Sequence, residues 1–120
     1  MKMENDQTTN LAELREIVDK FVRERDWKGY HTPKALAIAI SIEAAELLEH
    51  FLFQTEEQLP EDPKKRENFT DEMADVMIYL LALMNSLGIT NFTEILNRKM
   101  EKNRRKYPID QFSGKNYQKQ

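Results

Sequence analysis

Apolar side chains recur every three or four positions between residues 11 and 22, the spacing that places them on one face of an α-helix. They are Leu11, Leu14, Val18, Phe21 and Val22. Asn10 precedes the run and Glu13 follows three residues later, a pair typical of a helix N-terminus. The pattern predicts a first helix from Asn10 to about Trp27, ended by Gly29.

A second apolar segment begins after residues that favour a helix start. Thr32 is a suitable N-cap, and Pro33 fits the first helical position because the N–H that it lacks has no partner there. We expect this helix to reach about Phe53. The next stretch, residues 54–69 with the sequence "QTEEQLPEDPKKRENF", is polar and contains two prolines. It is the main predicted loop, with a helical start at Asp62.

A third apolar segment has helical spacing over residues 69–84. Its apolar members are Phe69, Met73, Val76, Met77, Leu80, Leu81 and Met84. Gly88 is the expected terminator of this helix. Because a single loop joins it to the preceding helix, we expect the two helices to lie antiparallel.

Asn91 and Glu94 form another capping pair, which opens a fourth helix expected to run through about Lys106. Residues 108–120 have no periodicity and, like residues 1–9, are expected to be extended tails. No segment alternates apolar and polar residues as a strand would. The pattern therefore predicts a single all-α domain, a bundle of four to five helices.

Composition narrows the class of protein. The chain has 120 residues, of which 40% are hydrophobic and 32% charged, and its three glycines and four prolines favour a few long helices. A net charge of −3 gives no global reason to expect a nucleic-acid or anionic-membrane partner. The absence of cysteine excludes disulfides and thiolate metal sites. With a polar start and no run near the ~20 apolar residues that span a bilayer, we expect a soluble cytoplasmic protein.

Four carboxylates interrupt the most apolar parts of the second and third helices. Glu43 and Glu46 are three residues apart and share one helix face, and Glu72 and Asp75 repeat this spacing on the next helix. If the two helices are antiparallel, the four acids meet. An ionised pair at ~6 Å repels by roughly 3 kcal/mol at an effective dielectric constant near ~20, and several such pairs rival a whole domain's stability of ~5–15 kcal/mol.

Either protons or cations must therefore reduce the charge of such a cluster. Oxygen ligands without histidine or cysteine favour Mg²⁺ or Mn²⁺, and Mg²⁺ commonly bridges a few carboxylates to the phosphates of a substrate. The alternative is that the acids line a solvated face. A ferritin-like di-iron bundle is disfavoured because no glutamate is followed three residues later by histidine.

The sequence around these acids resembles a known family. "EAAE", with Glu43 and Glu46, is followed after 25 residues by "EMAD", with Glu72 and Asp75. This order is similar to the E-x-x-E and E-x-x-D signature of the all-α nucleoside triphosphate pyrophosphohydrolases, the MazG-like superfamily. The blocks "ERDWKGYHTPKALAIAISIEAAELLEHF", "DEMADVMIYLLAL" and "KMEKNRRKYP" are similar to its dCTP pyrophosphatase branch, so the resemblance covers roughly residues 10–108.

The resemblance implies that the four acids bind Mg²⁺, with Mn²⁺ as an alternative. It also implies an enzyme that splits a nucleoside triphosphate between its α and β phosphates into the monophosphate and pyrophosphate. The implied substrate is dCTP or a related pyrimidine deoxynucleotide. Val18 and Phe53 stand where close relatives have histidine and tryptophan, which leaves a dUTP-type or a broad-specificity enzyme as alternatives. A non-catalytic helical nucleotide-binding or regulatory module is a further alternative.

Aromatic residues are implied to form the base and sugar pocket. The junction "DWKGYH" between the first and second helices supplies Trp27, Tyr30 and His31, and Tyr79 lies one turn after Asp75. By resemblance, these side chains contact the substrate, and an aromatic face can stack on a pyrimidine. The alternative for the junction is ordinary packing at a helix corner.

Residues 98–106, "RKMEKNRRK", hold six basic residues. By resemblance, Lys99, Asn103 and Arg104 contact the nucleotide or its phosphates, and lysine and arginine suit phosphate oxygens. The alternative is a solvated helix end whose cations interact with the helix dipole.

The apolar stretches "ALAIAISI" and "VMIYLLALM" give the second and third helices more apolar surface than the first and fourth can cover. A two-fold interface between copies of the chain would bury this surface. We therefore expect a homo-oligomer, either a dimer or a tetramer, with the nucleotide pocket near a subunit interface. The resemblance implies the same assembly, with the fourth helix reaching across.

Overall fold

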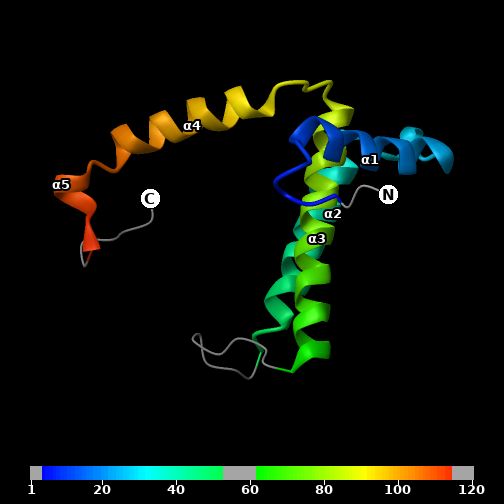
Figure 1. Cartoon of the computed structure of the whole chain (residues 1–120), viewed down its shortest axis with the longest axis horizontal. Coiled ribbons are helices and arrows are strands. Elements are labelled where there is room, and N and C mark those ends of the chain that lie inside the picture. The colour runs from blue at the N-terminus through cyan, green and yellow to red at the C-terminus, as the bar shows by residue number, and fades with distance from the viewer. Residues whose placement is uncertain (1–3, 53–61, 115–120) are drawn as a thin grey trace. The chain divides into compact units, whose positions relative to one another are not determined.

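The computed structural model describes residues 4–52 and 62–114, where all regular secondary structure is helical (Figure 1). The elements are α1 (Leu11–Glu24), the 3₁₀ helix η1 (Lys28–Tyr30), α2 (Pro33–Glu49), α3 (Pro63–Ser86), α4 (Phe92–Lys106) and α5 (Ile109–Phe112). None of the described helices is long and apolar enough to span a membrane. The all-α fold predicted from the sequence is confirmed.

The chain divides into two compact units between Thr90 and Asn91. The first contains α1, α2 and α3, and the second contains α4 and α5. The single domain expected from the sequence stays a prediction. The four acids lie in the first unit, and the basic segment lies in the second.

Each of the four long helices begins with a side chain that accepts a hydrogen bond from a backbone N–H in the first turn. These pairs, at 2.9–3.2 Å, are Asn10 with Glu13, Thr32 with Ala35, Asp62 with Lys65, and Asn91 with Glu94. Pro33 and Pro63 occupy the first position of α2 and α3, where a missing N–H costs nothing. The helix starts expected from the sequence, including the one at Asp62, are confirmed.

The end of α1 differs from the expectation. The helix stops at Glu24, three residues before Trp27, because the chain turns at Asp26, whose φ is +53°. Aspartate tolerates this left-handed conformation better than most residues. The N–H of Trp27 then donates to the carbonyl of Val22 at 3.0 Å, which closes the last turn. Gly29, the expected terminator, lies instead within η1.

The end of α3 is the one expected. Gly88 has a φ of +68° and donates its N–H to the carbonyl of Asn85 at 3.1 Å, and Ile89 donates to Met84 at 2.9 Å. This pair of bonds is the usual termination in which glycine takes the left-handed position. For α2, the helix ends at Glu49 and is followed by turns through residue 52, so it is shorter than expected. Phe53, the predicted end, lies outside the described residues.

The terminal segments are not simply extended where the structure describes them. Residues 5–9 form a turn in which the N–H of Thr8 donates to the carbonyl of Asn5 at 3.0 Å. After α4, the predicted tail contains the one-turn helix α5. The rings of Tyr107 and Phe112 meet edge-to-face at 5.3 Å, a contact that stabilises this turn and that helical periodicity does not encode.

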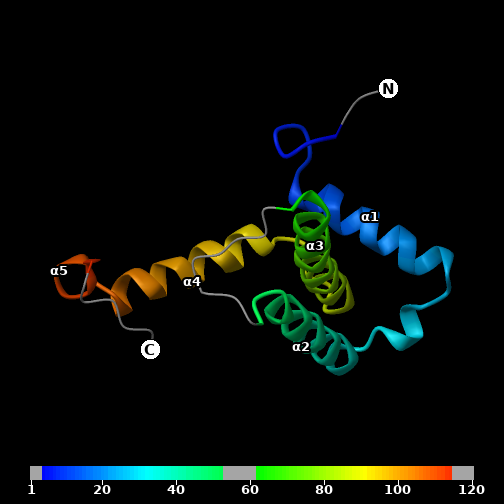
Figure 2. The same cartoon turned by 90° about the horizontal axis from the view of Figure 1, so that it is seen from below.

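In the first unit, α2 and α3 lie side by side and antiparallel, as expected, and α1 packs against α3 (Figures 1 and 2). The buried apolar residues come from all three helices. They are Val18 and Val22 of α1, Leu36 of α2, and Leu81, Ala82 and Met84 of α3. The core thus lies around the part of α3 that α1 and α2 both contact.

A buried arginine ties α1 to the end of α3. Arg15 is 8% exposed and donates from Nη2 to the carbonyl of Thr90 at 3.0 Å. Asn85 donates from Nδ2 to the carbonyl of Arg15, also at 3.0 Å. These two bonds hold α1 at a defined position along α3.

Many large apolar side chains remain exposed in the single chain. On α2 and α3 they are Ile38, Ile42, Leu48, Met73, Met77, Ile78 and Leu80. Exposed apolar side chains that gather into one patch commonly mark an interaction surface.

The left-handed turn at Gly88 generates a prediction about stability. A Cβ at this position would contact nothing within 4 Å, so the cost of Gly88→Ala comes from backbone strain at φ +68°. We expect this variant to lose about 1–2 kcal/mol of unfolding free energy in denaturant titrations. Gly29→Ala is the matched control, because its Cβ also meets nothing and its φ is not positive. Equal stability of the two variants would contradict the strain argument.

Candidate functional site

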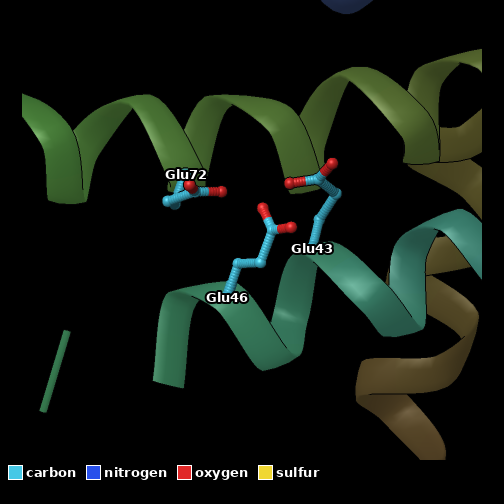
Figure 3. A group of neighbouring side chains, drawn as sticks. All are labelled: Glu43, Glu46 and Glu72. Carbon is cyan, nitrogen blue, oxygen red and sulfur yellow. The ribbon is translucent and has the colours of Figure 1, made fainter. Parts of the chain in front are cut away.

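Three carboxylates face one another between α2 and α3. Glu43 and Glu46 point from α2 toward Glu72 on α3, and one carboxylate oxygen of each lies within 4.8 Å of the others (Figure 3). The i, i+3 spacing puts the first two on one face of α2, and the antiparallel packing brings that face to α3. The structure thus brings together three of the four predicted acids.

Asp75, the fourth predicted acid, is placed differently. It is half-buried one turn after Glu72, and it is outside the group of three whose oxygens lie within 4.8 Å. Asp75 lines a neighbouring apolar cavity, yet its charge still acts on Glu43. Asp75 therefore lies between the acidic cluster and this cavity.

Burial raises the pKa of Glu43 from 4.5 to about 7, and its interactions with the nearby acids add to this effect. These acids are Glu46, Glu72 and Asp75. The Oε2 atoms of Glu43 and Glu72 are buried and have no hydrogen-bond partner among the described residues. The cluster therefore favours a shared proton or a bound cation.

The donor set fits a hard divalent cation. All of the clustered side chains offer carboxylate oxygens, and two of those oxygens are buried without a partner. Mg²⁺ and Mn²⁺ prefer such ligands, and a cation would relieve the repulsion that raises the pKa of Glu43. Glu43, Glu46 and Glu72 are the residues that would hold it, with Asp75 beside them.

An apolar cavity of about 390 Å³ adjoins the acids. It is lined by Ile17, Val18, Phe21, Val22, Trp27, His31, Asp75, Ile78, Tyr79 and Ala82. The ring of Trp27 lies 5.7 Å from that of Phe21, edge-to-face, and 6.5 Å from that of His31. Three of the four predicted aromatic residues, Trp27, His31 and Tyr79, therefore share one cavity, as does Val18.

Tyr30 is the predicted pocket residue that the structure places elsewhere. It is 77% exposed and does not line the apolar cavity. The reason is local, because η1 turns the chain between Trp27 and His31 and directs the intervening side chain to the surface.

A more open, polar cavity of about 520 Å³ lies on the other side of the cluster. It is lined by Glu46, Glu49, His50, Asn68, Asp71 and Glu72. Asn68 and Asp71 were not predicted from the sequence. Asn68 lies four residues before Glu72, so the helical spacing that identified the acids also places it on their face.

The basic residues lie in the second unit. Arg104 makes an ion pair with Glu101 at 3.2 Å, and Arg105 approaches the same carboxylate at 3.6 Å. Lys99 is exposed and Asn103 is half-buried on the same helix, α4. Their role toward a nucleotide stays a prediction.

Comparison with known proteins gives consistent results. The MazG-like family profile matches residues 38–119. The chain is 37% identical over 101 residues to dCTP pyrophosphatase 1 of Homo sapiens and 33% identical over 102 residues to that of Bos taurus, in each case over 82% of this chain. It spans 59% and 60%, respectively, of the length of these relatives. It is also similar to the crystal structure of a pyrophosphatase from Archaeoglobus fulgidus, with a TM-score of 0.69 and 41% identity, covering 90% of this chain and 98% of that one.

The raised pKa of Glu43 predicts how the metal-free protein responds to pH. The folded state holds the Glu43 proton up to a pH of about 7, whereas the unfolded state loses it near 4.5. This contribution to stability is full below pH 4.5 and is lost as the pH rises through about 7. Thermal unfolding in chelator should therefore show stability falling over this interval more steeply in the wild type than in Glu43→Gln.

Mg²⁺ added at pH 8 and constant ionic strength should restore stability in the wild type more than in Glu43→Gln, because the cation replaces the proton. Parallel pH curves for the two proteins would contradict the assignment of this proton to Glu43.

Proposed function

This chain belongs to the MazG-like family, and on that basis we propose that it is a Mg²⁺-dependent nucleotide pyrophosphohydrolase. Its reaction would convert a nucleoside triphosphate into the monophosphate and pyrophosphate. The observation that carries this proposal is the set of facing carboxylates on α2 and α3 next to an apolar cavity lined by aromatic side chains. The likeness to proteins named dCTP pyrophosphatase and pyrophosphatase supports it.

The acids supply the means to bring a triphosphate and a water molecule together. A bound Mg²⁺ would neutralise phosphate charge and make a nearby water more acidic. Glu43, Glu46 and Glu72 would hold the cation, and Asp75 would lie on the side of the cavity. A carboxylate of the cluster that is not saturated by the cation would accept the proton of the attacking water. The bond from water oxygen to the α-phosphorus forms as the bond to the bridging oxygen breaks, and pyrophosphate leaves.

The apolar cavity would hold the nucleoside. Its volume of about 390 Å³ is within the range of small-molecule sites, and Asp75 joins it to the acids. Trp27 and His31 offer ring faces on which a base can stack, and Tyr79 lines the same cavity from α3. We propose a pyrimidine deoxynucleoside triphosphate as substrate, with dCTP first and a dUTP-type or broader range as the alternative. Val18 in this wall is apolar, so it cannot hydrogen-bond the base.

The basic residues of α4 would contact the triphosphate. Lys99 and Arg104 carry the charge that phosphate oxygens require, and Asn103 lies on the same helix. We propose that the chain assembles as a dimer or tetramer, and that α4 contributes these residues to a site in its own or a neighbouring subunit. The exposed apolar side chains of α2 and α3 support this assembly.

Product analysis tests the reaction. The protein should be incubated with Mg²⁺ and each common deoxynucleoside triphosphate in ¹⁸O-water. Attack at the α-phosphorus predicts monophosphate and pyrophosphate, with the heavy oxygen in the monophosphate only. Diphosphate and orthophosphate as products would contradict the proposed bond. No turnover on any nucleotide would favour a non-catalytic module.

The acids should be essential for turnover. Glu43→Gln, Glu46→Gln, Glu72→Gln and Asp75→Asn are each expected to lower kcat/KM by about a hundredfold or more while the protein still folds. Glu67→Gln is the control, because this exposed residue of α3 lines neither cavity. Near-normal rates in two of the four variants would show that the site is wrongly assigned.

Assembly should appear as a mass above that of one chain. Light scattering at micromolar concentration is expected to report at least twice the 14.3 kDa of the monomer. Ile42→Glu places a charge on the exposed apolar face of α2 and should lower this mass. Lys20→Glu, at an exposed position of α1, should leave the mass unchanged. A 14.3 kDa active species would contradict the assembly.

A further inference from the structure

The junction between α1 and α2, residues 25–32, forms one wall of the apolar cavity through Trp27 and His31. Its backbone hydrogen bonds are local. The N–H of Tyr30 donates to Trp27 at 2.9 Å, and the N–H of His31 donates to Lys28 at 3.2 Å. These bonds shape the junction but do not fix its distance from α3, which carries Asp75 and the opposite wall.

Side-chain contacts connect the junction to the helices on both sides. The ring of Trp27 meets that of Phe21 on α1, and Arg25 donates from Nη1 to the carbonyl of Phe21 at 3.1 Å. Lys28 Nζ pairs with Asp19 Oδ1 on α1 at 3.3 Å, and Ser86 Oγ on α3 donates to the carbonyl of His31 at 2.9 Å. The lysine is 60% exposed, so its ion pair contributes little. In the described part of the chain, the Ser86 bond is the only hydrogen bond between the junction and α3.

The Ser86 hydroxyl bonds differently from the helical hydroxyls of Ser41 and Thr70. Ser41 donates to the carbonyl of Ala37 at 3.0 Å, and Thr70 donates to Arg66 at 3.1 Å, both one turn back in their own helices. This is the usual local bond of serine and threonine in a helix. Ser86 instead reaches a residue 55 positions away in the sequence.

A third cavity, of about 240 Å³, lies beside these contacts. Its polar lining residues include the Lys28–Asp19 pair and the Ser86–His31 pair, together with Asn85. It shares Val22, His31 and Ala82 with the apolar cavity. His31 thus has the apolar cavity on one side and its supporting polar contacts on another.

We propose that Ser86 is a positioning residue that sets the Trp27–His31 wall of the nucleoside cavity relative to α3. The same helix carries Asp75 and Tyr79, so one rigid element sets the spacing between the acids and the stacking wall. This inference rests on the proposed function for the identity of the ligand. The hydrogen bond from Ser86 to His31 is itself present in the protein without ligand.

The first experiment needs no turnover. Trp27 is the only tryptophan in the chain, so its fluorescence reports on the junction. Ser86→Ala should increase quenching of Trp27 by acrylamide in the ligand-free protein, because the wall is less constrained. Ser86→Thr keeps the hydroxyl and should restore the wild-type value. Ser41→Ala, which removes a hydroxyl with a purely local bond, is the matched control.

The second experiment uses the substrate that the wild type turns over best. Loss of one net hydrogen bond predicts a KM about three- to tenfold higher for Ser86→Ala, with kcat within about twofold. For deoxyribose 5′-triphosphate without a base, KM should not change, because nothing stacks on the wall. A merely structural defect would raise both KM values together.

The outcomes separate the two proposals. Unchanged acrylamide quenching in Ser86→Ala, or an equal rise in KM with and without the base, would overturn the role of Ser86. Absence of turnover in the wild type would instead reject the pyrophosphohydrolase, while the quenching comparison would still decide whether the tether exists.

Discussion

Repulsion between like charges is the constraint around which the first unit is arranged. The packing of α2 against α3 brings oxygens of Glu43, Glu46 and Glu72 within 4.8 Å of one another. Two ionised carboxylates at ~6 Å cost about 3 kcal/mol, while burying a leucine side chain contributes about 1.5–3 kcal/mol. The free energy gained by burying the few core side chains is therefore of the same order as the repulsion among the ionised acids. A proton on Glu43 or a cation reduces the repulsion, which links the charge state of the site to the stability of the fold.

The long helix α3 provides the common frame for these parts. Residues 72, 75, 79, 82 and 86 follow one another at intervals of three or four, so they form a single stripe along the helix. The stripe begins with an acid of the cluster, continues as a wall of the apolar cavity, and ends at the serine that contacts the α1–α2 junction. Helical periodicity alone therefore explains why the acids, the cavity-lining residues and Ser86 lie on one face of α3.

Local sequence determines much of this structure, and the exceptions have local causes too. Capping side chains act on N–H groups two or three residues away, so the starts of the long helices could be read from single residues such as Thr32. The end of α1 could not, because aspartate at position 26 adopts the conformation that was expected of a glycine. The helix α5 depends on the contact of Tyr107 with Phe112, which no apolar repeat reveals.

In the site, residue spacing indicated which acids share a helix face. It could not give the position of the acids on α3 along the helix axis relative to those on α2. Glu72 joins the acidic cluster, whereas Asp75, one turn beyond it, lines the apolar cavity. Which acid of α3 meets those of α2 depends on how far α3 is shifted along α2. Tyr30 was predicted in the pocket by resemblance to the family, whereas it is 77% exposed at the 3₁₀ turn. Spacing on regular helices thus grouped three of the four acids, whereas the irregular junction has no regular spacing that would separate Tyr30 from Trp27 and His31.

The two faces of α2 connect the site to the surface of the unit. Residues 36, 39, 40, 43, 46 and 47 are buried or half-buried, so the acids share the face that packs toward α3 with Leu36. Ile38, Ile42 and Leu48 lie on the other side and are 52–64% exposed. A helix that is apolar on both sides is normally covered on both. The inner face of α2 thus carries the acids that could hold a cation, and its outer face carries the exposed apolar side chains that support the proposed assembly.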